Sequence, residues 1–265
     1  MARNTAFSVD AVRPPPHCIV LAPTLSLRSE FSMSSLNIVL AVLGAIGGAV
    51  WLVDQFKARL SSRAFFQVFK PYEEVVIVVP SLGQSGPNIT MTFEDALACA
   101  TAQTELVKQH VPYRVKLHTQ VTPDDRAQNL FIIGGEVVNE VMAAIAAEIQ
   151  LPIRAEPNIA GTQIKHRGVT VHPPLQLGQT DYAIIGVLRN PWANDPTKRA
   201  YIAAGAEGVG TWAAVLQLTA NAQQLAKHLR AHDISAKGHF QAVLDVEVHG
   251  YQLPASFIRR AIQLA

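Results

Sequence analysis

The sequence predicts an α/β protein: a three-layer, Rossmann-like domain with a mostly parallel sheet and helices on both faces, preceded by one transmembrane helix. Two observations lead to this prediction. From about residue 74 onward, strand-like and helix-like segments alternate, which places helices on both faces of a largely parallel sheet. Before that point, the stretch from Leu36 to Val53 is apolar, uncharged and close to the ~20 residues that span a bilayer.

Composition excludes several functional classes. Of the 265 residues, 49% are hydrophobic and 16% are charged, and the formal net charge is only +2. No basic stripe is present, so we expect no nucleic-acid partner. Cys18 and Cys99 lie too far apart in the chain to suggest a disulfide framework, which fits a reducing compartment.

The N-terminal part divides into three expected segments. Residues 1–35 are rich in proline and serine and are expected to be disordered, with Met33 an alternative to Met1 as the start of translation. Residues 36–57 form the expected transmembrane helix, and residues 58–72 a juxtamembrane linker. Gly44 and Gly48 form a G-x-x-x-G pair that predicts a homodimer.

Basic residues follow the apolar stretch rather than precede it. Lys57, Arg59, Arg63 and Lys70 lie on its C-terminal side. The positive-inside rule then places residues 73–265 in the cytoplasm, as the soluble domain of a single-pass cell-membrane protein. The alternative is an apolar helix buried in a core.

The first half of the domain alternates between strands and helices. Val75 to Val79 is a β-branched run, typical of a strand buried on both faces. Thr92 is expected to cap a helix, and Pro152 to stop an alanine-rich one. The expected elements are strands at 75–79, 113–119 and 129–133, and helices at 93–109 and 136–150.

The second half begins with a stretch, 151–180, that prolines and glycines break into loop and short edge strands. The turn-rich segment 190–198 predicts an antiparallel hairpin between its flanking strands. The expected elements are edge strands at 163–165 and 169–171, strands at 182–188, 200–204 and 240–248, and helices at 211–229 and 254–264.

Three loops follow predicted strands and lead into helices, so parallel strands would bring them to one rim of the sheet. Glycines allow a ligand to approach the backbone, and a helix N-terminus favours an anion. We therefore expect a nucleotide-like or phosphorylated ligand, although a carboxylate such as Glu136 at a helix start would oppose it. The expected ligand-binding residues are Ser81, Gly83, Ser85, Gly134, Gly135, Asn139, Gly205, Gly208, Gly210 and Thr211. The alternative is that glycine and serine simply meet the needs of the turns.

The glycine-rich turn from Gly205 to Thr211, GAEGVGT, resembles the glycine–threonine turn of the LOG and DprA-type nucleotide-binding folds, which carry G-G-x-G-T-x-x-E. The resemblance covers fewer than a dozen residues and implies a Rossmann-like nucleotide site. Ala214 stands where that family has its glutamate. Because the glutamate serves hydrolysis in the LOG enzymes, the resemblance implies binding more than catalysis.

Other catalytic and metal patterns are weak. Ser85 lacks the final glycine of a nucleophile elbow, because Pro87 stands in its place. His228 and His232 have one metal-ligand spacing, but a helix C-terminus also favours histidine, and we expect no metal site. The catalytic residues therefore stay unknown, and a nucleotide is the only cofactor class suggested.

Together these features predict a membrane-anchored cytoplasmic ligand-binding or sensor module. One alternative is an enzyme acting on a nucleotide or sugar phosphate, which requires Glu94, Asp95, Glu136 or Glu207 to face the rim. The other is a non-catalytic scaffold for protein contacts, which predicts a filled rim and an exposed apolar patch elsewhere.

Overall fold

The computed structural model describes residues 59, 62–69, 73–85, 88–158, 161–172, 180–247 and 254–264. The chain divides into two units, Met1–Trp51 and Leu52–Ala265, and all described residues belong to the second.

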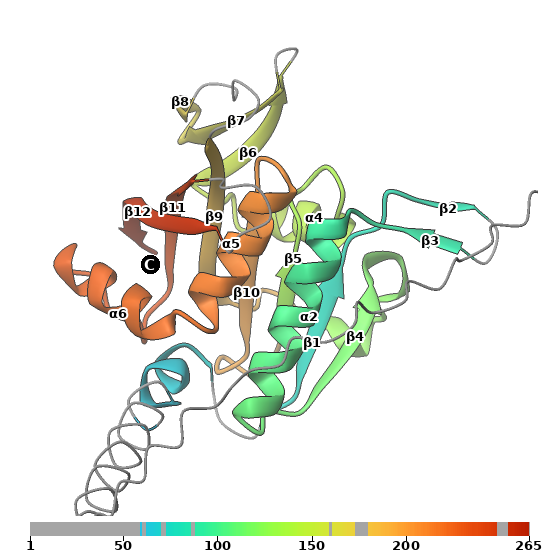
Figure 1. Cartoon of the computed structure of the whole chain (residues 1–265). Helices are drawn as coiled ribbons and strands as arrows, with labels where there is room; N and C mark the ends of the chain where they lie inside the picture. The colour runs from blue at the N-terminus through green and yellow to red at the C-terminus, as the bar shows by residue number, and fades with distance from the viewer. Residues whose placement is uncertain are drawn as a thin grey trace, which may run out of the picture. The chain divides into compact units, whose positions relative to one another are not determined.

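A seven-stranded mixed sheet forms the middle layer, in the order β12-β11-β9-β10-β5-β1-β4 (Figure 1). Its strands are β1 (Val75–Val79), β4 (Tyr113–Leu117), β5 (Asn129–Ile133), β9 (Thr180–Arg189), β10 (Arg199–Gly205), β11 (Phe240–Glu247) and β12 (Ala255–Gln263). Strands β4, β1, β5 and β10 are parallel, whereas β9, β11 and β12 pair antiparallel. The prediction of a mostly parallel sheet was therefore wrong. The β9–β10 hairpin reverses the chain direction, and β11 and β12 continue the antiparallel half of the sheet.

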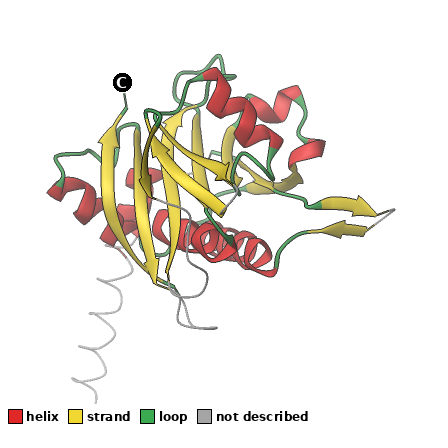
Figure 2. Cartoon of the chain, turned by 90° about the horizontal axis from the view of Figure 1, so that it is seen from above, coloured by secondary structure: helices red, strands yellow, loops and turns green. Residues whose placement is uncertain are grey.

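Helices cover both faces of the sheet (Figure 2). The helices are α2 (Phe93–Lys108), α3 (Pro123–Arg126), α4 (Glu140–Glu148), α5 (Gly208–Leu218) and α6 (Ala222–Ala231), with a 3-10 turn at His118–Gln120. Side chains of β1 alternate between the two faces: Ile77 packs under α2, α5 and α6, whereas Val76 and Val78 pack under α4.

A small second sheet covers the antiparallel half on the α4 side. It consists of β6 (Ile153–Asn158), β7 (Gly161–His166) and β8 (Val169–His172). Ile153 and Ile164 pack on Ile184 and Val243 of the main sheet. Gln241 fixes the junction, because its side chain accepts a hydrogen bond from Ile153 N and donates one to Ile153 O, each at 3.1 Å.

The segment 62–69 packs within the domain core. Phe65, Val68 and Phe69 are each 1% exposed. The Phe69 ring stacks on Tyr201 of β10 with centroids 4.2 Å apart. Part of the expected linker 58–72 thus contributes to the main core.

The predicted membrane anchor requires a correction. In the part of the chain that the structure describes, no helix is both long and apolar enough to cross a bilayer. For the described residues, this finding contradicts the predictions of a transmembrane helix and of a single-pass cell-membrane protein. The stretch from Leu36 to Val53, the pair Gly44 and Gly48, and the segment 1–35 all lie outside the described residues.

Three further elements differ from expectation. The helix expected at 254–264 is replaced by strand β12 (Ala255–Gln263), because β11 offers an open edge and Arg259 pairs with Asp245 across the strands at 3.2 Å. The helix expected at 211–229 is two helices, since the backbone turns at Thr219. The loop after β1 contains a short hairpin, β2 (Gly83–Ser85) and β3 (Asn88–Thr90).

Candidate functional site

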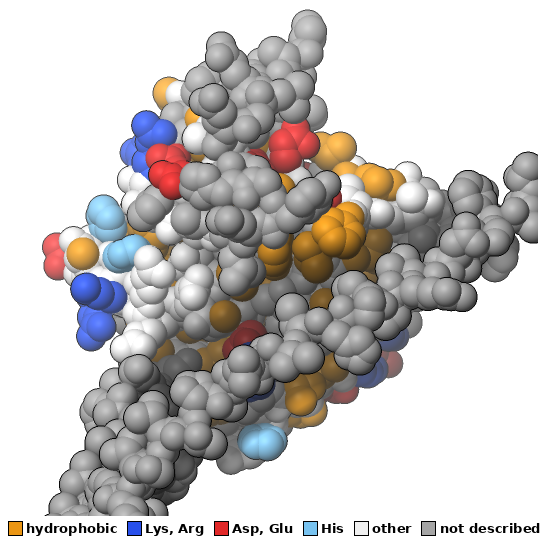
Figure 3. Space-filling view, in the orientation of Figure 1, with side chains coloured by type: hydrophobic (Ala, Val, Ile, Leu, Met, Phe, Trp, Pro, Cys, Tyr) orange, Lys and Arg blue, Asp and Glu red, His pale blue; other side chains and the backbone are white. Residues whose placement is uncertain are grey.

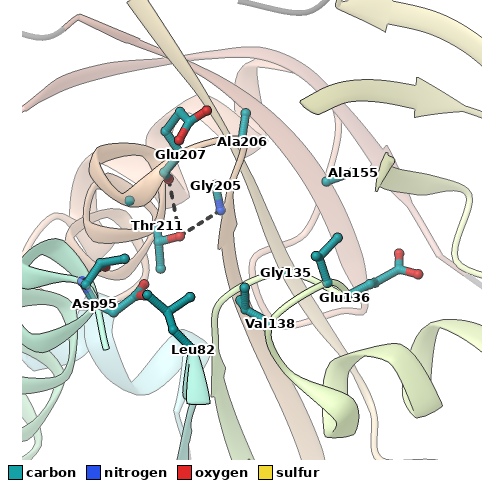
Figure 4. A pocket seen from close by; sticks show the side chains of 13 residues that line it. Leu82, Asp95, Gly135, Glu136, Val138, Ala155, Gly205, Ala206, Glu207 and Thr211 are labelled. Carbon is teal, nitrogen blue, oxygen red and sulfur yellow. Dashed lines mark hydrogen bonds between the residues drawn. The ribbon is translucent and has the colours of Figure 1, made fainter. Parts of the chain in front are cut away.

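A pocket of about 270 Å³ lies at the carboxyl ends of β1, β5 and β10. The loops that follow these three strands form its walls, and Ala155 of β6 completes them (Figure 4). Its lining residues are Leu82, Thr92, Asp95, Gly135, Glu136, Val137, Val138, Ala155, Gly205, Ala206, Glu207, Gly208 and Thr211.

The position of the pocket follows from the topology. After β1 the chain continues into α2 on one face of the sheet and returns in β4, on one side of β1. After β5 it continues into α4 on the opposite face, and β10 lies on the other side. The two connections therefore diverge between β1 and β5. Such a divergence leaves a crevice at the carboxyl ends of the strands, where open α/β sheets bind their ligands.

The N-terminus of α5 already carries an anion from the protein itself. The Asp181 carboxylate, 2% exposed, accepts backbone hydrogen bonds from Tyr182 N at 2.6 Å, Glu207 N at 3.1 Å and Gly210 N at 2.5 Å. Burial raises the pKa of Asp181 to about 6, although these three bonds act in the opposite direction. The place expected for a ligand phosphate is thus partly taken by a side chain.

The glycines of the turn are required by close packing. A Cβ at Gly205 would clash with backbone atoms of Glu207 and Thr211, and one at Gly210 would clash with Tyr182 O. At Gly208 it would lie 2.8 Å from Cβ of Glu94. The turn itself therefore accounts for these glycines, whether or not a ligand binds there.

Thr211 and Asn139 both use their side chains to hold loops. Thr211 lies inside α5, which begins at Gly208, and its hydroxyl accepts from Gly205 N at 3.0 Å. Asn139 is the N-cap of α4: it accepts from the amides of Val141 and Met142 and donates to Ile133 O. The helix expected to begin at Glu136 therefore begins four residues later.

The segment between β1 and α2 meets the pocket at Leu82 and at Thr92, the N-cap of α2. The Ser81 hydroxyl lies 3.0 Å from Nε2 of His118. Gly83 and Ser85 belong to the β2–β3 hairpin. Among the expected ligand-binding residues, the pocket is lined by Gly135, Gly205, Gly208 and Thr211, whereas Ser81, Gly134, Asn139 and Gly210 are not among the described lining residues.

Acidic side chains are the main polar groups of the pocket. Asp95 is 5% exposed, and its carboxylate lies between Leu82 and Thr211 (Figure 4). Burial raises the pKa of Asp95, while a hydrogen bond with the Thr92 side chain lowers it. Glu136 pairs with Arg154 through Nε at 3.0 Å and through a second guanidinium nitrogen. In the sequence, Asp95 is a candidate only under the enzyme alternative.

Large apolar side chains surround the mouth. Leu82 and Val137 line the pocket and are 55% and 68% exposed, and Phe93, beside Thr92, is 64% exposed. Figure 3 shows hydrophobic side chains gathered over the upper end of α2, near acidic ones. The pocket thus combines an apolar rim with a buried carboxyl group, that of Asp95.

Comparison with known proteins gave no relative: no family model, no curated protein and no solved structure matches the chain. The resemblance of the turn from Gly205 to Thr211 to LOG and DprA-type folds therefore stays a prediction. Ala214, at the position of that family's glutamate, is fully buried on α5.

Proposed function

We propose that the α/β domain is a small-molecule binding module and that the pocket at the carboxyl ends of β1, β5 and β10 is its site. One observation supports this most strongly: the pocket lies where the connections after β1 and β5 diverge to opposite faces of the sheet. That location is the default ligand site of an open α/β sheet. The expected nucleotide-like or phosphorylated ligand stays a prediction that the experiment below addresses.

The rim also bears on the scaffold alternative. A scaffold without a ligand predicts a filled rim, whereas this rim holds about 270 Å³ of open space. Of the exposed large apolar side chains, Leu82 and Val137 lie at that space, whereas Val107, Val115 and Val169 lie outside its lining. The open space at the rim therefore favours ligand binding over a pure protein-contact role.

An enzyme is a second candidate because of Asp95. This carboxyl group faces the pocket, and burial raises its pKa. Carboxyl groups of this kind serve as general acids or bases. If the domain is an enzyme, Asp95→Asn should abolish turnover while the binding of an uncharged substrate analogue persists. A turnover that is unchanged in Asp95→Asn would exclude this role for Asp95.

Thermal unfolding of the full-length chain against a ligand panel tests the proposal. The panel should contain nucleotides, sugar phosphates, amino acids and amines. A ligand at 100 times its Kd stabilises the folded state by about 2.7 kcal/mol, which raises Tm by about 5–10 °C for a domain of this size.

Gly135→Leu is the matched variant, because it adds a side chain at a lining position where a Cβ meets no clash. The nearest atom to a Cβ at Gly135 is Gly205 O at 4.0 Å. Ala100→Leu, on the exposed side of α2, adds the same side chain away from the pocket. We expect a saturable rise in Tm that Gly135→Leu removes and Ala100→Leu retains. An equal rise in both variants, or none with any ligand, would refute the proposed site.

A further inference from the structure

The charge of the pocket restricts the class of ligand that it can bind. This inference rests on the proposed function of the same pocket. Its lining includes Asp95, Glu136 and Glu207, and no lysine or arginine is among the lining residues that the structure describes. Arg154 neutralises Glu136 from outside the pocket. Asp95 and Glu207 therefore leave the walls with a negative charge.

Asp95 is the buried member of this pair. Its side chain interacts with Thr92, and within the described ranges no lysine, arginine or histidine forms an ion pair with it. A buried carboxylate without a cation is unfavourable, and burial accordingly raises its pKa. A cation in the pocket would meet this carboxylate within a largely desolvated wall, where charge pairing is strong.

An anionic ligand would find no free counter-charge at the start of α5. The N-terminal amides of Glu207 and Gly210 are bonded to Asp181, so the positive end of the α5 dipole already has its counter-charge. A phosphate bound there would approach the carboxylates of Asp181, Glu207 and Asp95 together. The walls therefore disfavour a phosphorylated ligand.

The remaining walls are apolar. Leu82, Val138 and Ala155 face the pocket, and its volume of about 270 Å³ lies just below the ~300–1,000 Å³ typical of ligand sites. From these observations we infer that the pocket binds a small amine or guanidinium compound. Its cationic head pairs with Asp95, near Glu207, and its short apolar body lies against Leu82 and Val138.

A matched probe series tests this inference on the full-length chain. Butylamine, butanol, pentanoate and butyl phosphate share one butyl body and differ in their heads, and ligand-observed NMR titration gives the Kd of each. We expect butylamine to bind at least ~10-fold more tightly than pentanoate and butyl phosphate, a difference of about 1.4 kcal/mol. Gly135→Leu should remove the binding of all four.

Two charge variants assign the effect. Asp95→Asn should weaken butylamine ~10-fold and leave butanol unchanged, because only the cation loses its partner. Glu207 is exposed, so its charge is more solvated than that of Asp95. Glu207→Gln should therefore weaken the binding of butylamine only ~2–3-fold. Glu148→Gln, an exposed acid on α4, serves as the control and should change neither ligand.

The outcomes separate this inference from the proposed function. Tightest binding by butyl phosphate, lost in Gly135→Leu, would overturn the cationic ligand and retain the pocket as a binding site. Butylamine binding that survives both Asp95→Asn and Glu207→Gln would also overturn the inference. If none of the four binds, or if Gly135→Leu changes nothing, both the inference and the proposed site fail.

Discussion

The two ends of the parallel strands differ in how they treat buried polar groups. At the amino ends, Asn190 donates from Nδ2 to Arg126 O and Gln128 O, each at 2.6 Å, and accepts from Trp192 N at 3.0 Å. Asn129 donates to Glu73 and accepts from Arg199 N. These side chains join loops that are far apart in the sequence.

At the carboxyl ends, the polar groups divide into two kinds. Asp181 is bonded to three backbone amides and holds the start of α5. Asp95 instead lies at an open pocket and interacts with Thr92. Burial of a polar residue alone therefore does not indicate function. A buried group that is fully bonded holds the fold, whereas one that faces open space can hold a ligand.

The largest effect on stability is expected at the amino end. Asn190→Ala removes three hydrogen bonds and leaves two carbonyls and one amide without this partner, which should lower the free energy of unfolding by about 3–5 kcal/mol. Urea unfolding measures the loss. Asn194→Ala, exposed in the same turn, should change it by less than about 0.5 kcal/mol. Equal effects of the two variants would contradict the structural role of Asn190.

Asp181 should give the next largest effect, through pH. Its pKa of about 6 in the folded state exceeds the ordinary value of 3.8, so the folded protein binds the proton more tightly than the unfolded chain. Its contribution should stabilise the fold as pH falls from about 6 to about 4, by up to ~3 kcal/mol. Unfolding measured across this range should show a slope that Asp181→Asn removes. The same slope in Asp181→Asn would assign it to other groups.

Asp125 should show the opposite dependence. Burial alone would raise its pKa, but hydrogen bonds from Lys116 and Thr122 lower it to about 2. Its stabilisation is therefore complete above about pH 4 and lost as pH falls to about 2. Asp125→Asn should cost about 2 kcal/mol at pH 7 and almost nothing at pH 2. A loss that is independent of pH would mean that packing, not charge, explains the effect.

The smallest effect is expected at the pocket wall. Glu136 forms a partly exposed ion pair with Arg154, and such pairs contribute under about 1 kcal/mol. Glu136→Gln should change Tm by no more than a few degrees while the pocket keeps its shape. A much larger drop would show that this pair supports the fold, as the amino-end asparagines do.

Local patterns predicted much of this fold. The β-branched run Val75–Val79, the Thr92 cap and the hairpin between β9 and β10 all depend on neighbouring residues, and the structure confirms them. The last segment, 254–264, could not be assigned in this way. Its apolar residues fit a helix as well as a strand, and the edge of β11 decides the outcome.

The position of the pocket was predictable from the sequence, whereas the side chains around it were less so. The glycine-rich turn does lie at the rim, and Gly135 does line the pocket. The sequence gives no local sign that Asp181, 29 residues before Gly210, would occupy the amides expected to hold a phosphate. Tertiary placement of one carboxylate therefore occupies amides that the turn was expected to offer to a phosphate.

The most direct test of the central claim is an amide chemical-shift map of the full-length chain titrated with butylamine. We expect saturable shifts at Gly135, Gly205 and Gly208, at the carboxyl end of the parallel strands, and unchanged signals at Asn129 and Asn190. Shifts confined to the amino end, or no saturable shift at the pocket, would contradict the claim that the carboxyl end holds the site.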